Sequence, residues 1–414
     1  MELIMLLGSF VFALLFLFLL FVFIASMLSL FKKEIVVEYE PKISIIIPCY
    51  NEEKNILKCL DAIASSDYPK KKMEIIVVDD GSTDNTLNIL KGYSKKNLIK
   101  IVKGTHEGKS ESLNRGAKKA SNEFIVAVDA DTLLEIATLR KLIQPFADPK
   151  TGATNGSCIV RNKGSLLGMF QNIEYHYNNL IRRSFSLLFK NGIWFFGAFA
   201  GYRKSVLEKI GYFKKDSLTE DTDIALEIYS AGYKVLNVHD AIGHVLAPST
   251  LKEFYKQRSR WWIGVLQSLK KNRHLFSYNS SPSILFLFIS QFWWSFYALA
   301  SMPLIAYQFY YWLPSSSFYE IASYTFRWFT ATGPLYVIYK IPEWGISLYS
   351  IFGVLSGLIS IVLIITAIFV FKEKLRLKNI VGIFFYFPYT IVLNTIIVIS
   401  LFKIIFLKQR YFKY

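Results

Sequence analysis

The chain has 414 residues, of which 53% are hydrophobic and 16% aromatic, and its mean hydropathy is +0.32. This composition excludes an ordinary soluble protein and indicates an integral membrane protein with a soluble part. The formal charge of +17 suits an anionic membrane surface or a phosphate-rich ligand. Because no basic run is interleaved with aromatic residues, we do not expect the chain to bind nucleic acid.

The N-terminal segment, residues 3–31, is an almost unbroken run of Leu, Phe, Val and Ile without a charge. It exceeds the ~20 residues that a helix needs to cross a bilayer. A cleaved signal peptide is the alternative, but the run is too long for one and lacks a clear small-x-small cleavage site. Lys32 and Lys33 follow directly, so the positive-inside rule predicts a transmembrane helix over residues 1–33 and a cytoplasmic domain after it.

Residues 42–250 alternate predicted strands and helices that are joined by short loops, a pattern typical of a parallel α/β sheet. Polar side chains repeatedly follow the predicted strands, where ligands collect in such sheets. These side chains are Tyr50, Glu52, Asp80, Asp129 and Asp131. A GxGxxG fingerprint and a Walker loop are both absent, so a nucleotide would not be held in the dinucleotide or P-loop manner.

The strand at Phe124–Val128 ends in two carboxylates, Asp129 and Asp131, which are separated by one small residue. Two carboxylates at this spacing suit a hard divalent cation that also holds phosphate oxygens. The alternative is a turn with solvated aspartates, and the pair alone does not exclude it.

Four segments then occur in order: SIIIPCYNEEKNI, IIVVDDGSTDNT, GKSESLNRG and VAVDADT. Together they resemble the donor-binding half of family-2 glycosyltransferases with the GT-A fold. The resemblance, which covers about residues 42–265, implies a Rossmann-like α/β domain with a mostly parallel sheet and an α-helical transmembrane region beside it. It also implies a nucleotide-diphosphate sugar as donor, with a UDP-sugar favoured.

The resemblance assigns donor-side roles to six residues. Tyr50 and Glu52 would frame the nucleobase and ribose, and Asp80 and Lys109 would contact the nucleotide. Asp129 and Asp131 would hold Mg²⁺ or Mn²⁺ on the diphosphate, where a metal stabilises the leaving group.

Thr219-Glu220-Asp221 stands at the start of a predicted helix. Plain capping is one reading, because acidic residues in a first turn complement the helix dipole. The family, however, carries a Thr-Glu-Asp triplet whose Asp is the general base. The resemblance therefore implies that Asp221 takes the proton of an acceptor hydroxyl and that Glu220 orients the site.

Residues 257–261 match the Q-x-x-R-W pattern of membrane-bound polysaccharide synthases in this family. The resemblance implies that Trp261 lies under the acceptor sugar, that Gln257 contacts the acceptor, and that Arg258 and Arg260 bind the diphosphate. The alternative is an amphipathic interfacial helix over residues 251–280, and both can hold at once.

Gly201 belongs to a segment, Gly197–Lys204, that resembles the family's acceptor pocket, where small residues permit a sugar to come close. Upstream, Leu166–Leu188 mixes aromatic residues with arginines and reads as an amphipathic helix on the membrane surface.

The C-terminal part, residues 281–414, is predicted to be transmembrane helices. Clear spans are residues 283–313 and 346–371, and a third at 379–407 contains Pro388. A simple third crossing would put the basic tail after residue 407 outside, against the positive-inside rule; a re-entrant segment would not.

The segment 318–341 is aromatic but carries Glu320 and Arg327. It could be an interfacial segment, an extracytoplasmic loop or a poor span.

We therefore expect a multi-pass plasma-membrane protein whose cytoplasmic domain is an inverting glycosyltransferase. Its acceptor would be a growing β-linked polysaccharide, or alternatively a lipid or polyprenyl-linked acceptor in a glycolipid-forming enzyme. A remote alternative is an inactive nucleotide-binding receptor or transporter. A pore lined by polar and aromatic side chains would favour polymer export, whereas a lateral apolar opening would favour a lipid.

Overall fold

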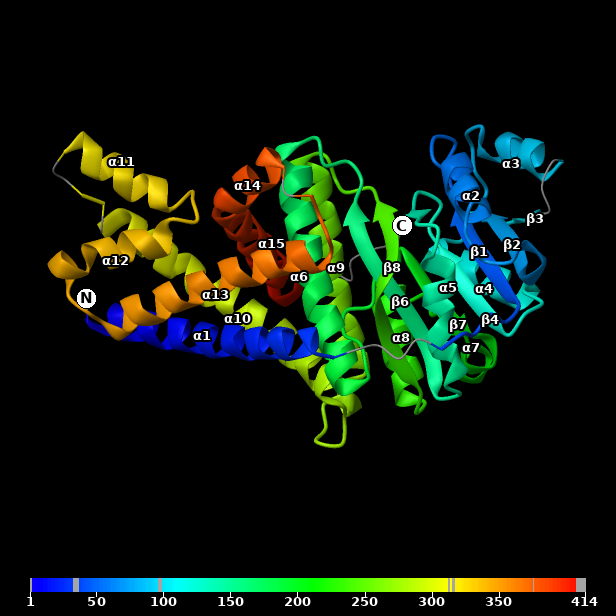
Figure 1. Cartoon of the computed structure of the whole chain (residues 1–414), viewed down its shortest axis with the longest axis horizontal. Coiled ribbons are helices and arrows are strands. Elements are labelled where there is room, and N and C mark those ends of the chain that lie inside the picture. Colours follow the sequence, from blue (N-terminus) through cyan, green and yellow to red (C-terminus); the bar gives the residue numbers. More distant parts are fainter. Residues whose placement is uncertain are drawn as a thin grey trace.

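The computed structural model describes residues 2–32, 37–95, 99–311, 313–314, 317–374 and 376–406. An α/β domain forms one end of the molecule and long helices form the other (Figure 1). The basic tail that was considered above lies outside the described residues.

A single sheet crosses the α/β domain, and the described part of the chain contributes eight strands in the order β3-β2-β1-β4-β7-β6-β8-β5. The strands are β1 (Ile43–Cys49), β2 (Met73–Asp79), β3 (Ile99–Lys103), β4 (Phe124–Val128), β5 (Leu133–Leu134), β6 (Thr151–Val160), β7 (Phe199–Arg203) and β8 (Lys234–Val245). β1 to β4 pair in parallel, as do β6 and β8. β7 lies antiparallel between β4 and β6, and β5 lies antiparallel beside β8. The predicted mostly parallel α/β sheet is confirmed.

Helices cover both faces of the sheet. They are α2 (Ile56–Ala64), α3 (Thr86–Ser94) and α5 (Thr138–Ile143) on one face, and α4 (Lys109–Lys119), α7 (Lys204–Ile210) and α8 (Glu220–Ser230) on the other. In β1, Ile45 and Ile47 point into the first core and Ile46 into the second, and all three are buried. Because both faces are covered, β1 reads as an unbroken apolar run rather than an alternating one. Short 3₁₀ turns occur at η1 (Lys70–Lys72), η2 (Gln144–Ala147) and η3 (Arg273–Leu275).

Two helices, α6 (Leu166–Phe189) and α9 (Leu251–Lys271), lie between the sheet and the helical region (Figure 1). The sequence predicts that α6 lies on the membrane surface. The structure instead covers it with protein on both sides. Toward the sheet, Arg182 donates to the carbonyl of Gly156 at 3.0 Å. On the other side, Arg183 donates to Ser29 of α1 (Glu2–Leu30) at 2.9 Å. The two arginines that suggested an amphipathic surface helix thus bond to protein groups on its two sides.

Within the described residues, four helices are long and apolar enough to cross a membrane: α1, α10 (Pro282–Tyr311), α13 (Leu348–Val370) and α15 (Phe387–Phe406). α1 packs along α13, with the ring of Phe12 5.0 Å from that of Tyr349. The third expected C-terminal span is divided just before Pro388 into α14 (Leu377–Phe384) and α15.

The uncertain segment 318–341 forms two short helices, α11 (Phe318–Arg327) and α12 (Gly333–Trp344), of 10 and 12 residues. At ~1.5 Å per residue, neither reaches across a bilayer of ~30 Å.

Two helical glycines test the packing of the sheet against its helices. A Cβ on Gly116 of α4 would lie 2.4 Å from Cγ2 of Ile46, whereas a Cβ on Gly92 of α3 would meet no atom within 4 Å. We expect Gly116→Ala to destabilise the protein by about 1–3 kcal/mol through overpacking. We expect Gly92→Ala to stabilise it by about 0.5–1 kcal/mol, because alanine loses less backbone entropy. Thermal unfolding of the detergent-solubilised protein measures both, and an unchanged Tm for Gly116→Ala would contradict this packing.

Candidate active site

The parallel strands β1, β2 and β4 end at the same edge of the sheet, and this edge positions the donor-side residues. Cys49, the last residue of β1, pairs with Asp79, the last residue of β2, and β4 runs beside β1 in the same direction. The loops that follow carry Tyr50 and Glu52, Asp80, and Asp129 with Asp131. The structure therefore brings the predicted donor-side residues to one edge.

Asp80 lies beneath the loop that precedes α4. Its carboxylate is buried and accepts the backbone N–H groups of Glu107 at 3.0 Å and of Gly108 at 2.8 Å. The same loop places the imidazole of His106 4.1 Å from the ring of Tyr50, which is half-exposed. Asp80 thus holds this loop in place, and the loop sets the ring of His106 beside that of Tyr50. Sequence reasoning missed His106, because a lone histidine in a loop gives no signal.

Glu52 links the nucleotide end to the paired aspartates. Its carboxylate accepts the side-chain amide of Asn55 at 2.9 Å. Burial raises the pKa of Glu52, and the charge of Asp131 adds to this effect.

Lys109, at the start of α4, joins the two halves of the site. Its Nζ lies 2.6 Å from Oδ1 of Asp129 and 3.3 Å from Oε1 of Glu220. It also donates to the carbonyl of Gly197 at 3.3 Å. Burial raises the pKa of Asp129 to about 7, with Asp131 adding to the rise and Lys109 opposing it. A single ammonium therefore balances carboxylates from the end of β4 and from the start of α8.

Asp221 and Glu220 begin α8 and titrate differently. Burial and the neighbouring charge of Glu220 raise the pKa of Asp221 to about 6. Burial opposes the charge of Glu220 as well, but Lys109 stabilises it enough to leave the pKa of Glu220 below its ordinary value. The pKa values of these two adjacent carboxylates therefore differ: Glu220 stays charged, and Asp221 can exchange a proton near neutral pH.

Gly197 is a site residue that sequence reasoning named only as part of a segment. A Cβ at this position would stand 2.9 Å from Oδ2 of Asp221, so only glycine allows the backbone to come this close. The carbonyl of Gly197 also accepts Lys109.

Gly201, in contrast, lies inside the sheet. It pairs with Val126 and Thr154 in the neighbouring strands, and a Cβ on it would meet the hydroxyl of Thr154 at 2.5 Å. This corrects the expectation that Gly201 lines the acceptor pocket. Its small size serves the packing of β7, while Gly197 and Ala198 of the same segment line the cavity.

A cavity of about 1240 Å³ begins at these charged residues and extends between the helices. Lys109, Asp129, Asp131, Glu220 and Asp221 line its inner end. The side chains of the Q-x-x-R-W segment on α9 face the same space, and they are Gln257, Arg258, Arg260 and Trp261. One continuous space therefore connects the donor-side carboxylates with the expected acceptor side chains.

The two arginines of α9 have different surroundings. Arg260 donates to the carbonyl of Leu218 at 3.0 Å, and its charge acts on Glu220 and Asp221. Arg258 instead pairs with Glu174 of α6 at 2.8 Å and lies over the ring of Trp261 at 4.5 Å. The charge of Arg258 is thus paired and its position supports Trp261, so its expected contact with a diphosphate stays a prediction. Arg260 remains available to an anionic ligand.

Asp129 and Asp131 provide the oxygen donors for a metal. The described residues contain no cluster of three or more His, Cys, Asp or Glu side chains that could hold an ion. Two carboxylates fit a hard divalent cation only if a bound ligand, such as a diphosphate, completes the coordination. The donor set therefore fits a cation that is shared with the substrate.

Comparison with known proteins shows what the domain that carries this site is similar to. Residues 44–211 match the family model described as glycosyl transferase family 2. It is 37% identical over 226 residues to the poly-beta-1,6-N-acetyl-D-glucosamine synthase of Staphylococcus epidermidis, which covers 54% of this chain and 54% of the relative. It is 35% identical over 237 residues to the synthase of the same name from Staphylococcus aureus, covering 56% and 57%. The match thus spans little more than half the length of these relatives.

A solved structure shares the fold over most of the chain. It is the mannosyltransferase PcManGT from Pyrobaculum calidifontis in complex with GDP-Man and Mn²⁺, with a TM-score of 0.63 and 23% identity. The superposition covers 90% of this chain and all of that one, which confirms the expected fold class.

The pKa of Asp221 predicts the pH dependence of sugar transfer. Only the deprotonated carboxylate can accept a proton, so activity is present above the pKa and is lost as pH falls through it. We expect kcat/KM to fall with an apparent pKa of about 6 at saturating Mn²⁺. A profile that stays flat from about pH 8 to pH 5 would contradict this role.

Proposed function

We propose that this protein is a membrane-embedded inverting glycosyltransferase that moves a sugar from a nucleotide-diphosphate sugar to an acceptor hydroxyl. The acceptor is the growing end of a β-linked polysaccharide. The observation that carries the proposal is the continuous cavity that joins the Asp129–Lys109–Glu220 cluster and Asp221 to Trp261.

In this reaction Asp221 takes the proton of the acceptor hydroxyl, and the oxygen attacks the anomeric carbon while the diphosphate leaves from the opposite side. The acceptor supplies the nucleophile, so one displacement suffices and the anomeric configuration inverts. Glu220 remains charged and holds Lys109 in place. Lys109 and Arg260 provide positive charge toward the departing diphosphate.

A divalent cation belongs to this proposal. Asp129 and Asp131 would hold it, and it would supply charge stabilisation to the diphosphate. The Mn²⁺ in the mannosyltransferase of the same fold supports a divalent ion, and the carboxylate donors here suit Mn²⁺ and Mg²⁺ alike.

The donor that we propose is a UDP-sugar, and the acceptor a saccharide. Relatives that are 37% and 35% identical to this chain over 226 and 237 aligned residues are named for a polymer of N-acetylglucosamine. The neighbouring rings of Tyr50 and His106 offer aromatic surface for a nucleobase.

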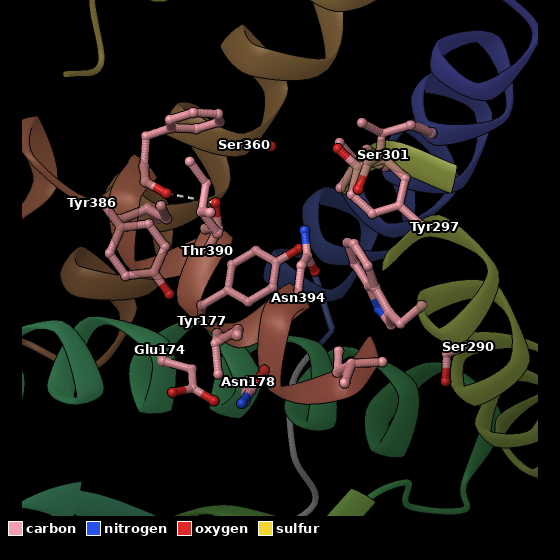
Figure 2. Close-up of a pocket in the computed structure, with 18 of the residues that line it drawn as sticks. Glu174, Tyr177, Asn178, Ser290, Tyr297, Ser301, Ser360, Tyr386, Thr390 and Asn394 are labelled. Carbon is pink, nitrogen blue, oxygen red and sulfur yellow. Dashed lines mark hydrogen bonds between the residues drawn. The ribbon is translucent and has the colours of Figure 1, made fainter. Parts of the chain in front are cut away.

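Polar and aromatic side chains in the cavity wall support a polysaccharide acceptor, although more of the lining is apolar than polar. Figure 2 shows hydroxyl, amide and aromatic side chains along the cavity as it passes between the helices. They include Tyr177, Asn178, Tyr297, Ser360, Thr390 and Asn394. Such groups can bond to sugar hydroxyls and stack on sugar rings. Sugar-compatible groups therefore continue well beyond the site of transfer.

A second function is supported by the aliphatic part of the same wall. Leu15 and Leu19 of α1 and Ile361 and Ile364 of α13 also line the cavity, and an acyl or polyprenyl chain could lie against them. This observation favours a glycolipid-forming enzyme as the alternative. The charged cluster at the inner end argues against an inactive receptor or transporter.

We further propose a multi-pass protein of the plasma membrane with its α/β domain in the cytoplasm. The four candidate spans and Lys32 at the domain-side end of α1 support this orientation. The donor and the catalytic residues would then meet on the side where nucleotide sugars are made.

Two isosteric variants test the assigned roles. We expect Asp131→Asn to lose metal-dependent donor binding, because it removes a charged oxygen ligand. We expect Asp221→Asn to bind donor as the wild type does but to lose about 10²–10⁴-fold in kcat, because no base accepts the proton. Donor affinity is measured by calorimetry with Mn²⁺ and kcat by release of nucleotide in the presence of acceptor.

Asp216→Asn is the matched control, since Asp216 is largely exposed and lies five residues before Asp221. It should leave both measurements unchanged. Transfer by Asp221→Asn at the wild-type rate would show that another group is the base.

A further inference from the structure

A buried arginine stands at the outer end of the cavity, away from the catalytic domain. Arg327 ends α11, is only 8% exposed and lines the cavity. Four aromatic rings surround its guanidinium with centroids at 4.3 to 5.6 Å: Tyr324, Trp328, Tyr336 and Trp344. Its Nε has no hydrogen-bond partner, and no carboxylate among the described residues forms an ion pair with it. The charge is therefore buried, and the described part of the chain supplies no counter-ion to it.

This arrangement differs from that of an ordinary interfacial arginine. An arginine at a membrane surface extends its head into water or the headgroups and stays exposed. Arg327 points inward instead, among rings that attract a cation but carry no net negative charge. An ionisable group that is buried and unpaired in a membrane region marks a functional site by default. Among the residues that the structure describes, none supplies an anion to this site.

The position of Arg327 in the molecule indicates which kind of anion could reach it. α11 and α12 connect α10 to α13 and lie at the end of the molecule remote from the sheet (Figure 1). Both are too short to span a bilayer, and they expose large apolar side chains such as Phe318, Leu335 and Tyr339. Helices of this kind lie in the membrane interface, at the level of the lipid phosphates.

The cavity next to Arg327 is suited to the rest of a lipid. Val337 of α12 and Val354 and Ile361 of α13 line it, together with apolar residues of α1 such as Leu15. These aliphatic side chains offer no favourable contact to a free inorganic anion, but an acyl chain could pack along them.

We propose that Arg327 binds the phosphate of an anionic phospholipid whose acyl chain lies along the aliphatic wall of α12 and α13. The planar guanidinium can donate two parallel hydrogen bonds to a phosphate, and the surrounding rings keep it in a fixed place and away from water. The site is distinct from the sugar-transfer residues at the inner end of the cavity. It does not depend on whether the enzyme makes a polymer or a glycolipid.

The test titrates the full-length, detergent-purified protein with short-chain phosphatidylglycerol and measures both Tm and the number of lipids retained in native mass spectrometry. We expect wild-type protein to gain stability and to retain lipid. Arg327→Met keeps the unbranched stem of the side chain as far as Nε and removes an unpaired buried charge, which should leave the lipid-free Tm equal or higher. Its affinity for phosphatidylglycerol should fall at least ~10-fold, since the charge-assisted bonds are lost.

Arg376→Gln is the control, because Arg376 is an exposed arginine at the start of α14 and should bind lipid as the wild type does. Arg327→Lys keeps the positive charge but loses the planar guanidinium with its parallel donors. Its affinity for phosphatidylglycerol should therefore lie between those of the wild type and Arg327→Met. Unchanged affinity in Arg327→Met would overturn the proposal. So would equal stabilisation by phosphatidylcholine, by inorganic phosphate or by an acidic oligosaccharide.

Discussion

The ion pairs of Lys109 are the interaction on which the site depends. Asp129, Asp131, Glu220 and Asp221 line one end of a single cavity, and four carboxylates so placed would resist ionisation without a cation among them. Lys109 contacts Asp129 and Glu220, which come from opposite halves of the domain. Glu220 is thereby kept charged while the pKa of Asp221 rises to about 6. The same contacts set the geometry of the site and influence the protonation of its carboxylates.

The helical region completes the site. Glu174 of α6 accepts hydrogen bonds from Arg258 of α9 and from the hydroxyl of Tyr389 of α15. Arg258 in turn supports the ring of Trp261. The acceptor side is thus held by three helices, one of which is a candidate membrane span. The α/β domain separated from these helices would lack this support for Trp261.

Much of the site could be predicted from the sequence, because its residues follow strands and begin helices. Asp80, Asp129 and Asp131 follow parallel strands, whose ends share one edge of the sheet. What could not be predicted depends on partners far along the chain. The partner of Arg258 is Glu174, which lies 84 residues away in the sequence. No local pattern around Arg258 indicates this ion pair. β7 pairs antiparallel with β4, and this pairing places Gly201 inside the sheet. Likewise, an amphipathic pattern does not tell whether protein or membrane covers α6.

The most direct measurement incubates the detergent-purified protein with radiolabelled nucleotide sugars, Mn²⁺ or Mg²⁺ and membrane lipid extract. The products are partitioned between organic solvent and water and then sized. Because the cavity continues past Trp261 along polar and aromatic side chains, we predict label from a UDP-sugar in long water-soluble chains. Label in the organic phase with one or two sugars per lipid would contradict the polysaccharide acceptor, and no transfer from any nucleotide sugar would contradict the glycosyltransferase itself.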